Sequence, residues 1–332
     1  MKVYIFTEGS SKIGYGHIVR CSALYQELEK RNIDVEFVIN GGKEIAEVEV
    51  LEGKKKLIKN WLSKDFLINL LKEDSYSIVD SYLAEQYIYE IISSNSTKAL
   101  FIDDNARINY PDGIVVNPSI YTDELDYSNS GNIDYLLGSK YVILRDSFKS
   151  GRRKCIKKDI EEILIVLGGS DIRNLTPKIL SSLKVEYPNI TKNVIIGKGF
   201  CNIEQIKSVK DKNINYYYNI DGNQMKELML KSDLAISAAG QTIYELIKTE
   251  TPFIPIQVIE NQNNNIKGLL KYNIAHKVLK SQSDNIIDEL LKEVKYLINY
   301  QTRLTLNIKL TGFIDGLGSA RIINKLLGID EL

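Results

Sequence analysis

The fold of this chain of 332 residues is decided near its start by residues 2–31, KVYIFTEGSSKIGYGHIVRCSALYQELEKR. Lys2–Phe6 is a short apolar run, typical of a buried strand, and a glycine-bearing loop follows at Thr7–Gly16. Along His17–Arg31, apolar residues recur every three or four positions, which predicts an amphipathic helix. A strand that leads through such a loop into a helix is the opening unit of a parallel sheet, because parallel neighbours need a crossover.

The same alternation of short apolar runs with longer amphipathic ones continues in two series. In the first series the pattern predicts strands at Val35–Ile39, Ser77–Val79, Ala99–Ile102 and Ile114–Val116, and helices at Leu62–Leu71 and Glu85–Ile92. In the second it predicts strands at Ile163–Leu167, Val194–Ile196, Leu234–Ile236 and Phe253–Ile256, and helices at Thr176–Val185, Met225–Lys231, Ile243–Lys248, Ile286–Ile298 and Ala320–Leu327. Each series is typical of an α/β domain with a parallel sheet.

A polar and basic segment, residues 146–158, separates the two series. Its charge run at Arg152–Lys154 is typical of a solvated linker. A chain of this length is expected to hold two domains. The sequence therefore predicts Rossmann-like domains at residues 1–150 and 151–332, and the last helix is a candidate to pack back on the N-terminal domain.

The composition of the chain argues against several classes of protein. Lys plus Arg and Asp plus Glu number 43 each, so the formal net charge is zero and a nucleic acid partner is not expected. The 3 cysteines are far apart, which argues against a disulfide framework or a cysteine zinc site. No apolar run is long enough for a membrane span, and the N-terminus lacks the pattern of a secretory signal. We therefore expect a cytoplasmic protein; the sequence leaves its oligomeric state open, with a monomer plausible.

In open α/β sheets, ligands bind at the carboxyl ends of the strands, where loops lead into helices. Loops of this kind are predicted at residues 7–17, 80–83, 103–107, 168–175 and 237–243. If the two domains face each other, these loops would line one central cleft. A small-molecule site in such a cleft is the expectation.

The first cluster of candidate residues is Gly14, Tyr15, Gly16 and His17, between the first strand and the first helix. Glycines let the backbone approach a ligand, and a helix N-terminus favours anions. His17 is one of 2 histidines in the chain, and a neutral imidazole suits a general base near pH 7. A structural histidine near a helix start is the alternative, but the glycines and the strand–loop–helix setting favour catalysis.

The second cluster follows the first strand of the second series and contains Gly168, Gly169, Ser170 and Asp171, with Asn174 downstream. A strand that ends in two glycines and a serine can present backbone N–H groups to phosphate oxygens. A tight turn with a serine or aspartate that caps the next helix explains the same residues. Taken alone, the cluster favours neither reading.

The third cluster contains Ala239, Gly240, Gln241 and Thr242, followed one helical turn later by Glu245. Small residues at a helix N-terminus leave space for a pyrophosphate. A carboxylate such as that of Glu245 can accept hydrogen bonds from both ribose hydroxyls, although a glutamate in a first turn also interacts favourably with the helix dipole.

Asn261 and Gln262 follow the next strand and could donate to a base, a sugar or a phosphate. Ordinary loop and capping chemistry is the alternative for this asparagine-rich stretch.

Carboxylates end two strands of the first series. Asp80-Ser81-Tyr82 follows one strand, and Asp103-Asp104 follows another. Such groups can orient a histidine or bind sugar hydroxyls, and Asp103 and Asp104 could equally start a turn. No histidine or cysteine lies nearby in the sequence to complete a transition-metal site, so we expect neither a metal nor another cofactor.

The order of these clusters along the chain is a more specific signal than any single cluster. The chain resembles the UDP-2,4-diacetamido-2,4,6-trideoxy-β-L-altropyranose hydrolases of pseudaminic acid biosynthesis, a family similar in turn to GT-B glycosyltransferases such as the UDP-GlcNAc transferase of peptidoglycan synthesis. The resemblance rests on Gly14–Cys21, Ala23-Leu24, Val79–Tyr82, Ile102–Asp104, Leu136–Gly138 through Leu144-Arg145, Leu167–Asp171, Asn174–Thr176, Asp233–Glu245 and Asn261-Gln262.

The resemblance implies a GT-B fold, with two Rossmann-like domains whose parallel sheets face a central cleft. It implies that the C-terminal half binds UDP and that the N-terminal half holds the sugar. His17 would be the catalytic histidine, with Tyr82 and Asp80 beside it. The substrate-binding residues would be Gly14, Tyr15, Gly16, Arg20, Gly168, Gly169, Ser170, Asn174, Ala239, Gly240, Gln241, Thr242, Glu245, Asn261 and Gln262.

The implied reaction is attack of water at the anomeric carbon of the UDP-sugar, with UDP as the leaving group and no metal. His17 would deprotonate or orient the water, and helix N-termini would stabilise the charge on the departing pyrophosphate.

Three other functions compete with hydrolysis. A GT-B glycosyltransferase for a surface or spore-coat polysaccharide would share the UDP site, but it needs an acceptor. A hydrolysing 2-epimerase would need acid and base groups around C2 of the sugar. A nucleotide-sugar sensor would bind UDP without turnover, and His17 argues against it because a binder has no special need for a general base.

Overall fold

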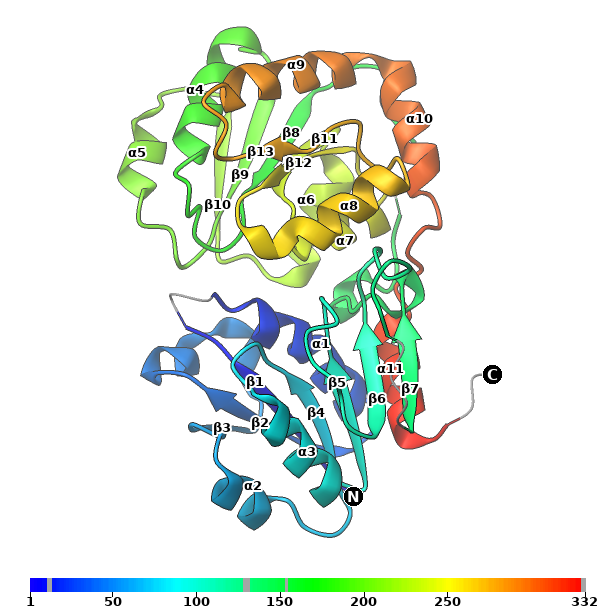
Figure 1. Ribbon diagram of the computed structural model, residues 1–332. Helices are drawn as coiled ribbons and strands as arrows, with labels where there is room; N and C mark the ends of the chain where they lie inside the picture. Colours follow the sequence, from blue (N-terminus) through cyan, green and yellow to red (C-terminus); the bar gives the residue numbers. More distant parts are fainter. Residues whose placement is uncertain (11–13, 128–131, 153–154, 330–332) are drawn as a thin grey trace. The chain divides into compact units, whose positions relative to one another are not determined.

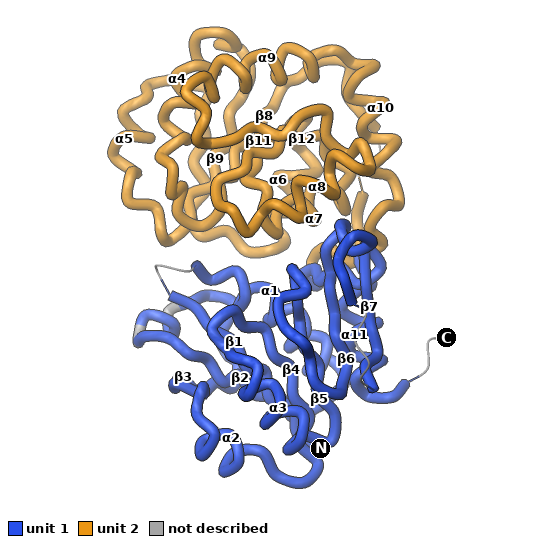
Figure 2. The backbone as a smooth tube through the Cα atoms, viewed as in Figure 1, with its two compact units in different colours: residues 1–146, 316–332 blue, residues 147–315 orange. Residues whose placement is uncertain are grey.

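The computed structural model describes residues 1–10, 14–127, 132–152 and 155–329. The chain divides into two compact units, which Figure 2 distinguishes by colour. Unit 1 contains residues 1–146 and 316–332, and unit 2 contains residues 147–315. Of the predicted linker, residues 153 and 154 lie outside the described part of the chain, and the described remainder forms only a short 3₁₀ turn at Asp146–Phe148.

Unit 1 is built on a seven-stranded parallel sheet in the order β3-β2-β1-β4-β5-β6-β7 (Figure 1). Its strands are β1 Lys2–Glu8, β2 Asp34–Asn40, β3 Lys56–Ile58, β4 Ser75–Asp80, β5 Lys98–Ile102, β6 Gly113–Asn117 and β7 Ile133–Leu137. Its helices are α1 Gly16–Glu29, α2 Lys64–Leu70, α3 Gln86–Asn95 and α11 Gly318–Leu327.

Alternate side chains of the central strand enter different apolar layers, as the pleat of a strand requires. Val3 and Ile5 join the layer that contains Leu24 of α1 and Ile322 of α11. Tyr4 and Phe6 join the opposite layer, together with Leu67 of α2 and Ile88 of α3. Two helices therefore cover each face of the sheet, and β1 is apolar along its length because both of its faces are buried.

Unit 2 contains a six-stranded parallel sheet in the order β10-β9-β8-β11-β12-β13. Its strands are β8 Glu162–Val166, β9 Thr191–Ile196, β10 Ile214–Tyr218, β11 Leu234–Ala238, β12 Phe253–Gln257 and β13 Leu279–Lys280. Its helices are α4 Thr176–Glu186, α5 Ile203–Ser208, α6 Gly222–Lys231, α7 Thr242–Lys248, α8 Asn263–Lys271, α9 Ile286–Ile298 and α10 Tyr300–Leu310. Ile163 and Ile165 of β8 pack in one apolar layer with Leu180 of α4 and Leu290 of α9.

Both sheets change the direction of strand addition next to their first strand. In unit 1 the chain runs outward from β1 to β2 and β3, then returns to place β4 on the other side of β1. In unit 2 it runs from β8 to β9 and β10, then places β11 on the other side of β8. The loops at the carboxyl ends of these central strands diverge, and open α/β sheets bind their ligands there.

The sequence-based prediction of two domains with parallel sheets is confirmed, and every predicted strand and helix is present within a few residues of its predicted bounds. The pattern missed four strands, β3, β7, β10 and β13, and three helices, α5, α8 and α10. All four missed strands lie at the edges of their sheets, where side chains are partly exposed and the apolar run is broken.

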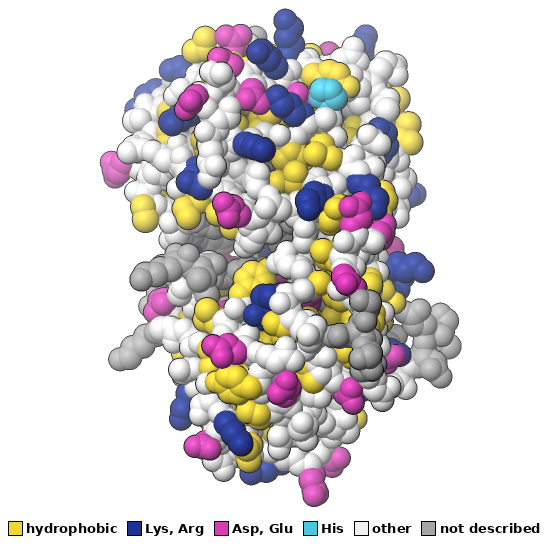
Figure 3. Space-filling view, in the orientation of Figure 1, with side chains coloured by type: hydrophobic (Ala, Val, Ile, Leu, Met, Phe, Trp, Pro, Cys, Tyr) yellow, Lys and Arg dark blue, Asp and Glu magenta, His cyan; other side chains and the backbone are white. Residues whose placement is uncertain are grey.

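Basic and acidic side chains are interspersed over the face of the molecule in Figure 3, as expected for a chain with 43 of each. Among the described residues, no helix has both the length and the apolar character that crossing a membrane requires.

Candidate functional site

His17 lies in the first turn of α1, the helix that leaves the carboxyl end of β1. Its Nδ1 is 2.7 Å from Oδ1 of Asp80, the last residue of β4. These residues are 63 positions apart in the chain, and they meet because β4 pairs with β1 in the sheet. The histidine–aspartate pair therefore lies at the point where the strand order of unit 1 changes direction.

Asp80 is buried and accepts several hydrogen bonds at once. Nε and Nη2 of Arg20 donate to it over 2.9 and 2.7 Å, and Sγ of Cys21 lies 3.5 Å away. Burial alone would raise the pKa of Asp80, but Arg20 and His17 outweigh burial and hold it well below the usual value for a carboxyl group. Asp80 is therefore ionised throughout the neutral range.

Arg20 joins two strand ends through its planar guanidinium. Besides its bonds to Asp80, it donates from Nη1 to Oδ1 of Asp104 over 2.6 Å and from Nη2 to Oδ2 over 3.1 Å. Burial opposes its charge, but the two carboxylates raise the pKa of Arg20 well above its usual value. The predicted substrate ligand Arg20 is thus engaged with protein carboxylates, an arrangement that orients Asp80 for His17.

The electrostatics of His17 follow from this carboxylate. Burial lowers the pKa of His17, but the charge of Asp80 and its hydrogen bond outweigh burial, so the pKa is raised overall. Arg20 lowers the pKa of His17 and Asp104 raises it, and both effects are weaker than those of burial and Asp80. A carboxylate at Nδ1 places the proton on that nitrogen, which makes Nε2 the basic nitrogen of the neutral ring.

Tyr82 completes the cluster from the loop after β4. Its ring packs edge-on against His17 with centroids 4.7 Å apart, and its hydroxyl donates to Oδ2 of Asp104 over 2.6 Å. Partial burial and the neighbouring Asp104 raise the pKa of the Tyr82 phenol, so it remains a hydrogen-bond donor at neutral pH. The structure thus brings together His17, Arg20, Asp80 and Tyr82, all of which are candidate residues of the sequence analysis.

The adjacent carboxylates Asp103 and Asp104 have different surroundings. Asp103 accepts from the backbone N–H of Ala106 over 2.7 Å and from the hydroxyl of Tyr127 over 2.7 Å, so it holds the turn after β5. Asp104 instead contacts Arg20 and Tyr82. Asp103 therefore has the turn role that the sequence offered, whereas Asp104 is bound by Arg20 and Tyr82.

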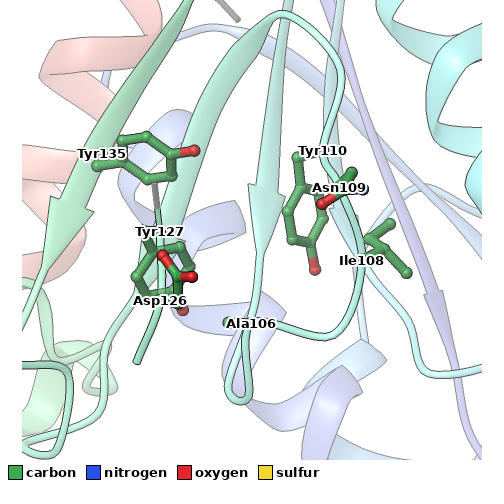
Figure 4. A pocket seen from close by; sticks show the side chains of 7 residues that line it. All are labelled: Ala106, Ile108, Asn109, Tyr110, Asp126, Tyr127 and Tyr135. Carbon is green, nitrogen blue, oxygen red and sulfur yellow. The ribbon is translucent and has the colours of Figure 1, made fainter. Parts of the chain in front are cut away.

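A polar pocket of about 90 Å³ lies beside the turn that Asp103 holds (Figure 4). Its lining side chains include Tyr110, Asp126, Tyr127 and Tyr135, and Ala106 lies at its edge. The hydroxyl of Tyr127 also accepts from the Asn117 side chain over 2.6 Å. The sequence analysis did not single out these tyrosines, because nothing in their spacing distinguishes them from core aromatics.

Glu8, the last residue of β1, was also missed. Its side chain is only 1% exposed, and its Oε1 accepts from the backbone N–H of Tyr82 over 2.6 Å and of Leu83 over 3.1 Å. Its Oε2 accepts from the hydroxyl of Ser81. A carboxylate at the end of a buried strand is the signal that could have identified Glu8.

The loop before α1 requires glycine at one predicted position. Gly14 has a φ of +81° and exchanges backbone hydrogen bonds with Ser10. Tyr15 packs against the apolar layer under α1, and Gly16 begins the helix. Among the described residues, no capping side-chain hydrogen bond is present at this end of α1.

The glycine loop of unit 2 follows β8. Gly168 has a φ of +78°, and a Cβ at either Gly168 or Gly169 would meet no atom within 4 Å. The carbonyl of Gly169 accepts from Gly199 N–H over 3.0 Å, and a Cβ at Gly197 would lie 2.6 Å from that carbonyl oxygen. Gly197 and Gly199, which the sequence analysis missed, therefore allow the loop after β9 to lie against the loop after β8.

The next residues of this loop have mixed surroundings. Ser170 is exposed, whereas Asp171 is buried and accepts from the backbone N–H of Thr176 at the start of α4. Asn174 exchanges side-chain hydrogen bonds with Asn202 and Gln205 over 2.6 and 2.7 Å. Asp171 thus accepts from the backbone at the start of α4, although the N-cap residue of that helix is Leu175, and Asn174 is held by its neighbours in unit 2.

The third predicted cluster follows β11. Ala239 and Gly240 precede Gln241 and Thr242, where α7 begins, and the carbonyl of Ala239 accepts from Asn265 over 3.0 Å. Glu245 is only 6% exposed in the first turn of α7.

Gln262 is brought to this cluster from the end of β12. Its Oε1 accepts from Val258 N–H over 2.9 Å, and its Nε2 lies 3.5 Å from where a Cβ on Gly240 would be. Asn261, its neighbour in the same 3₁₀ turn, is exposed. The predicted residues of unit 2 therefore gather at the carboxyl ends of β8, β11 and β12. Across the part of the chain that the structure describes, no three His, Cys, Asp or Glu side chains are grouped so as to hold a metal ion.

Residues 163–310 match the family model of the glycosyltransferase family 28 C-terminal domain. Among curated proteins, the chain is 30% identical to an uncharacterized protein of Methanocaldococcus jannaschii, with 82% of the chain and 58% of that protein covered. It is 27% identical to the spore coat polysaccharide biosynthesis protein SpsG of Bacillus subtilis, over 97% of the chain and 96% of that protein. It is also 27% identical to the UDP-2,4-diacetamido-2,4,6-trideoxy-β-L-altropyranose hydrolase of Campylobacter jejuni, over 83% of the chain and 100% of the hydrolase.

The fold is similar to that of a solved GT-B structure. The crystal structure of MurG from Acinetobacter baumannii matches 99% of the chain and 100% of its own length with a TM-score of 0.66 at 14% identity. The prediction of a GT-B fold with two Rossmann-like domains is confirmed, as is the predicted resemblance to the altropyranose hydrolases.

Proposed function

We propose that this protein hydrolyses a UDP-sugar to UDP and the free sugar, and that the substrate is UDP-2,4-diacetamido-2,4,6-trideoxy-β-L-altropyranose of pseudaminic acid biosynthesis. The observation that carries the proposal is the hydrogen-bonded pair of His17 and Asp80 at the switch point of the unit 1 sheet. Similarity to the Campylobacter hydrolase over its whole length supports the reaction and the substrate.

His17 is the general base in this proposal. Its Nδ1–H donates to Asp80, and its Nε2 takes a proton from a water molecule. The water oxygen forms a bond to the anomeric carbon as the bond from that carbon to the β-phosphate oxygen breaks, and UDP leaves with the electron pair. The proton on His17 then passes to solvent, which restores the base.

The neighbours of His17 prepare it for this step. Asp80 fixes the ring orientation and tautomer and stabilises the imidazolium that forms. Arg20 holds Asp80 in place, and Tyr82 covers one edge of the imidazole. The loop at Gly14, Tyr15 and Gly16 borders the place proposed for the sugar.

Unit 2 is proposed to bind the UDP moiety. The match of residues 163–310 to a glycosyltransferase family 28 domain supports a nucleotide-sugar site in this unit. Open glycine backbone and a helix N-terminus are suited to a pyrophosphate, and a carboxylate one turn into that helix is suited to a ribose. The proposed ligands are Gly168, Gly169, Ser170, Asn174, Ala239, Gly240, Gln241, Thr242, Glu245, Asn261 and Gln262. No metal is required in this scheme, because backbone N–H groups supply the electrostatic stabilisation.

The test is to incubate the protein with the UDP-activated diacetamido-trideoxy-altrose in EDTA and follow free UDP and free sugar by NMR. Both products should appear with the wild type and fall by about 100-fold or more with His17→Ala. His276→Ala is the matched control, because that histidine lies in unit 2, where it hydrogen-bonds with Glu293 and stacks on Tyr296. UDP binding without release of sugar would sink hydrolysis of this substrate and leave a transferase that awaits its acceptor.

A further inference from the structure

The turn at residues 81–83 holds Tyr82, yet none of the residues assigned to the reaction explains how the turn is fixed. Tyr82 contacts His17 through its ring and Asp104 through its hydroxyl, so its position depends on the backbone that carries it. The side chain of Tyr82 is 36% exposed, so packing around the ring alone does not enclose it. The position of Tyr82 therefore depends on contacts that other groups make with the backbone of this turn.

Glu8 provides that support from the neighbouring strand. Its two carboxylate oxygens accept from the backbone N–H groups of Tyr82 and Leu83 and from the hydroxyl of Ser81. The hydroxyl oxygen of Ser81 in turn accepts from the N–H groups of Leu83 and Ala84 over 3.1 and 2.9 Å. Every backbone N–H from Tyr82 to Ala84 is thus directed at Glu8 or at the serine that Glu8 holds.

Burial stabilises the hydrogen bonds between Glu8, Ser81 and the backbone of the turn. Glu8 is 1% exposed and Ser81 is 3% exposed, so the loss of a partner would leave a polar group without water to replace it. The carbonyl of Ser81 is also fixed, because it accepts from Tyr89 over 2.9 Å and from Arg107 over 3.2 Å.

We propose that Glu8 is a positioning residue of the site, which fixes the turn at residues 81–83 and thereby holds Tyr82 against His17 and Asp104. Glu8 acts through hydrogen-bond geometry at the end of β1, and it does not touch the substrate. The inference rests on the proposed function for its kinetic consequence alone, because the contact between Tyr82 and His17 can be measured without substrate.

Two substitutions separate geometry from charge. Glu8→Asp keeps the charge but shortens the side chain by one methylene, so the carboxylate cannot reach the two amides and Ser81 together. Glu8→Gln removes the charge but keeps the length and one oxygen for the two amides, although its NH₂ group cannot accept from the Ser81 hydroxyl. The positioning role predicts that Glu8→Asp disrupts the site more than Glu8→Gln does, which is the reverse of what a role of the charge predicts.

The first measurement is the NMR signal of the His17 ring, which the aromatic ring of Tyr82 shifts because of its closeness. With 2 histidines in the chain, His276 serves as the internal reference signal. In Glu8→Asp the His17 signal should move toward its place in Tyr82→Ala, and in Glu8→Gln it should move less. Glu36→Asp on β2, where the glutamate pairs with Lys2, is the matched control and should leave the signal in place.

The second measurement is turnover of the UDP-sugar. Glu8→Asp should lower kcat by about 10- to 100-fold, the range expected when a reacting group is displaced by about an ångström, with the affinity for UDP unchanged. In a Tyr82→Ala background the same change should cause little further loss, because the contact is already absent.

A wild-type His17 signal in folded Glu8→Asp would overturn the inference, as would additive losses of kcat in the double variant. If Glu8→Asp does not fold, Ser81→Ala carries the test. It removes the hydroxyl that links Glu8 to Ala84, and an unmoved His17 signal there would overturn the inference equally. A wild type without turnover would refute the proposed function and leave the NMR result to decide the role of Glu8.

Discussion

Nδ1 of His17 lies 2.7 Å from Oδ1 of Asp80, although the two residues are 63 positions apart in the chain. His17 lies in the first turn of the helix after β1, and Asp80 is the last residue of the neighbouring strand β4. The pair gives the imidazole a fixed tautomer and an ionised partner, which are the two conditions for a general base that acts through Nε2.

Asp80→Asn should lower kcat for release of UDP by about 100-fold or more, because an amide neither fixes the tautomer reliably nor stabilises the imidazolium. Since Asp80 raises the pKa of His17, the acid limb of the rate profile should move to lower pH in the variant. In the wild type this limb should have its midpoint above the ordinary histidine pKa of about 6.5. Rates measured across pH 5–9, roughly the range in which histidine titrates, check both statements. An acid limb that does not move would show that Asp80 does not control the pKa of the group that titrates there.

Arg20→Lys should reduce the free energy of unfolding by about 3 kcal/mol at pH 7, since an ammonium cannot bridge Asp80 and Asp104 as the planar guanidinium does. Both carboxyls have a lowered pKa in the folded protein, so their contribution is present above the unfolded value of about 3.9 and is lost as the pH falls through the folded values. The difference between variant and wild type should therefore shrink in acid. Urea unfolding at neutral and acidic pH measures it, with Arg321→Lys of α11, a half-buried arginine, as the control.

Tyr82→Phe should keep the ring beside His17 and lose only the hydrogen bond to Asp104. A hydrogen bond to a charged group contributes about 1.5–3 kcal/mol, so kcat should fall by roughly 10- to 100-fold. Tyr82→Ala should cost considerably more, because it also uncovers the imidazole. Steady-state kinetics of the two variants distinguish the hydroxyl from the ring, and equal losses would assign the whole effect to the hydroxyl.

Gly197→Ala should weaken UDP binding, because the new Cβ would lie 2.6 Å from the carbonyl oxygen of Gly169 and displace the glycine loop after β8. We expect a loss of about tenfold or more in affinity, which titration calorimetry with UDP measures. The control is Gly328→Ala at the end of α11, where φ is +68° and the new Cβ would meet no atom of the described residues outside its own helix within 4 Å. That variant should lose about 1 kcal/mol of stability and bind UDP normally. Normal UDP binding by Gly197→Ala would show that the glycine loop after β8 is not part of the UDP site.

Glu245→Gln should reduce the preference for ribose over deoxyribose. The carboxylate is proposed to accept from both ribose hydroxyls, and an amide oxygen is a weaker acceptor. Affinities for UDP and 2′-deoxy-UDP should differ by about tenfold in the wild type and by less in the variant. Equal discrimination by both proteins would show that Glu245 only serves the helix dipole.

The central strands and the edge strands of the two sheets differed in how well the sequence predicted them. β1 and β8 are buried on both faces, so their apolar runs are continuous and were found. β7 and β10 lie at sheet edges with partly exposed side chains, and their mixed composition is not distinguishable from a loop. Helix α10 was missed as well; the hydrogen bond from Thr302 N–H to the Asn299 side chain supports its start, a contact that the apolar pattern does not contain.

The sequence by itself determined the alternation of strands and helices, the loops at strand ends and the singular setting of His17, because these depend on local periodicity and on residue type. Only the tertiary structure decided that Asp80 contacts His17, that Arg20 bridges two carboxylates and that Glu8 binds the backbone of Tyr82. Those contacts depend on which strands are neighbours in the sheet, and strand order is set by the packing of distant segments, to which the local apolar pattern does not respond.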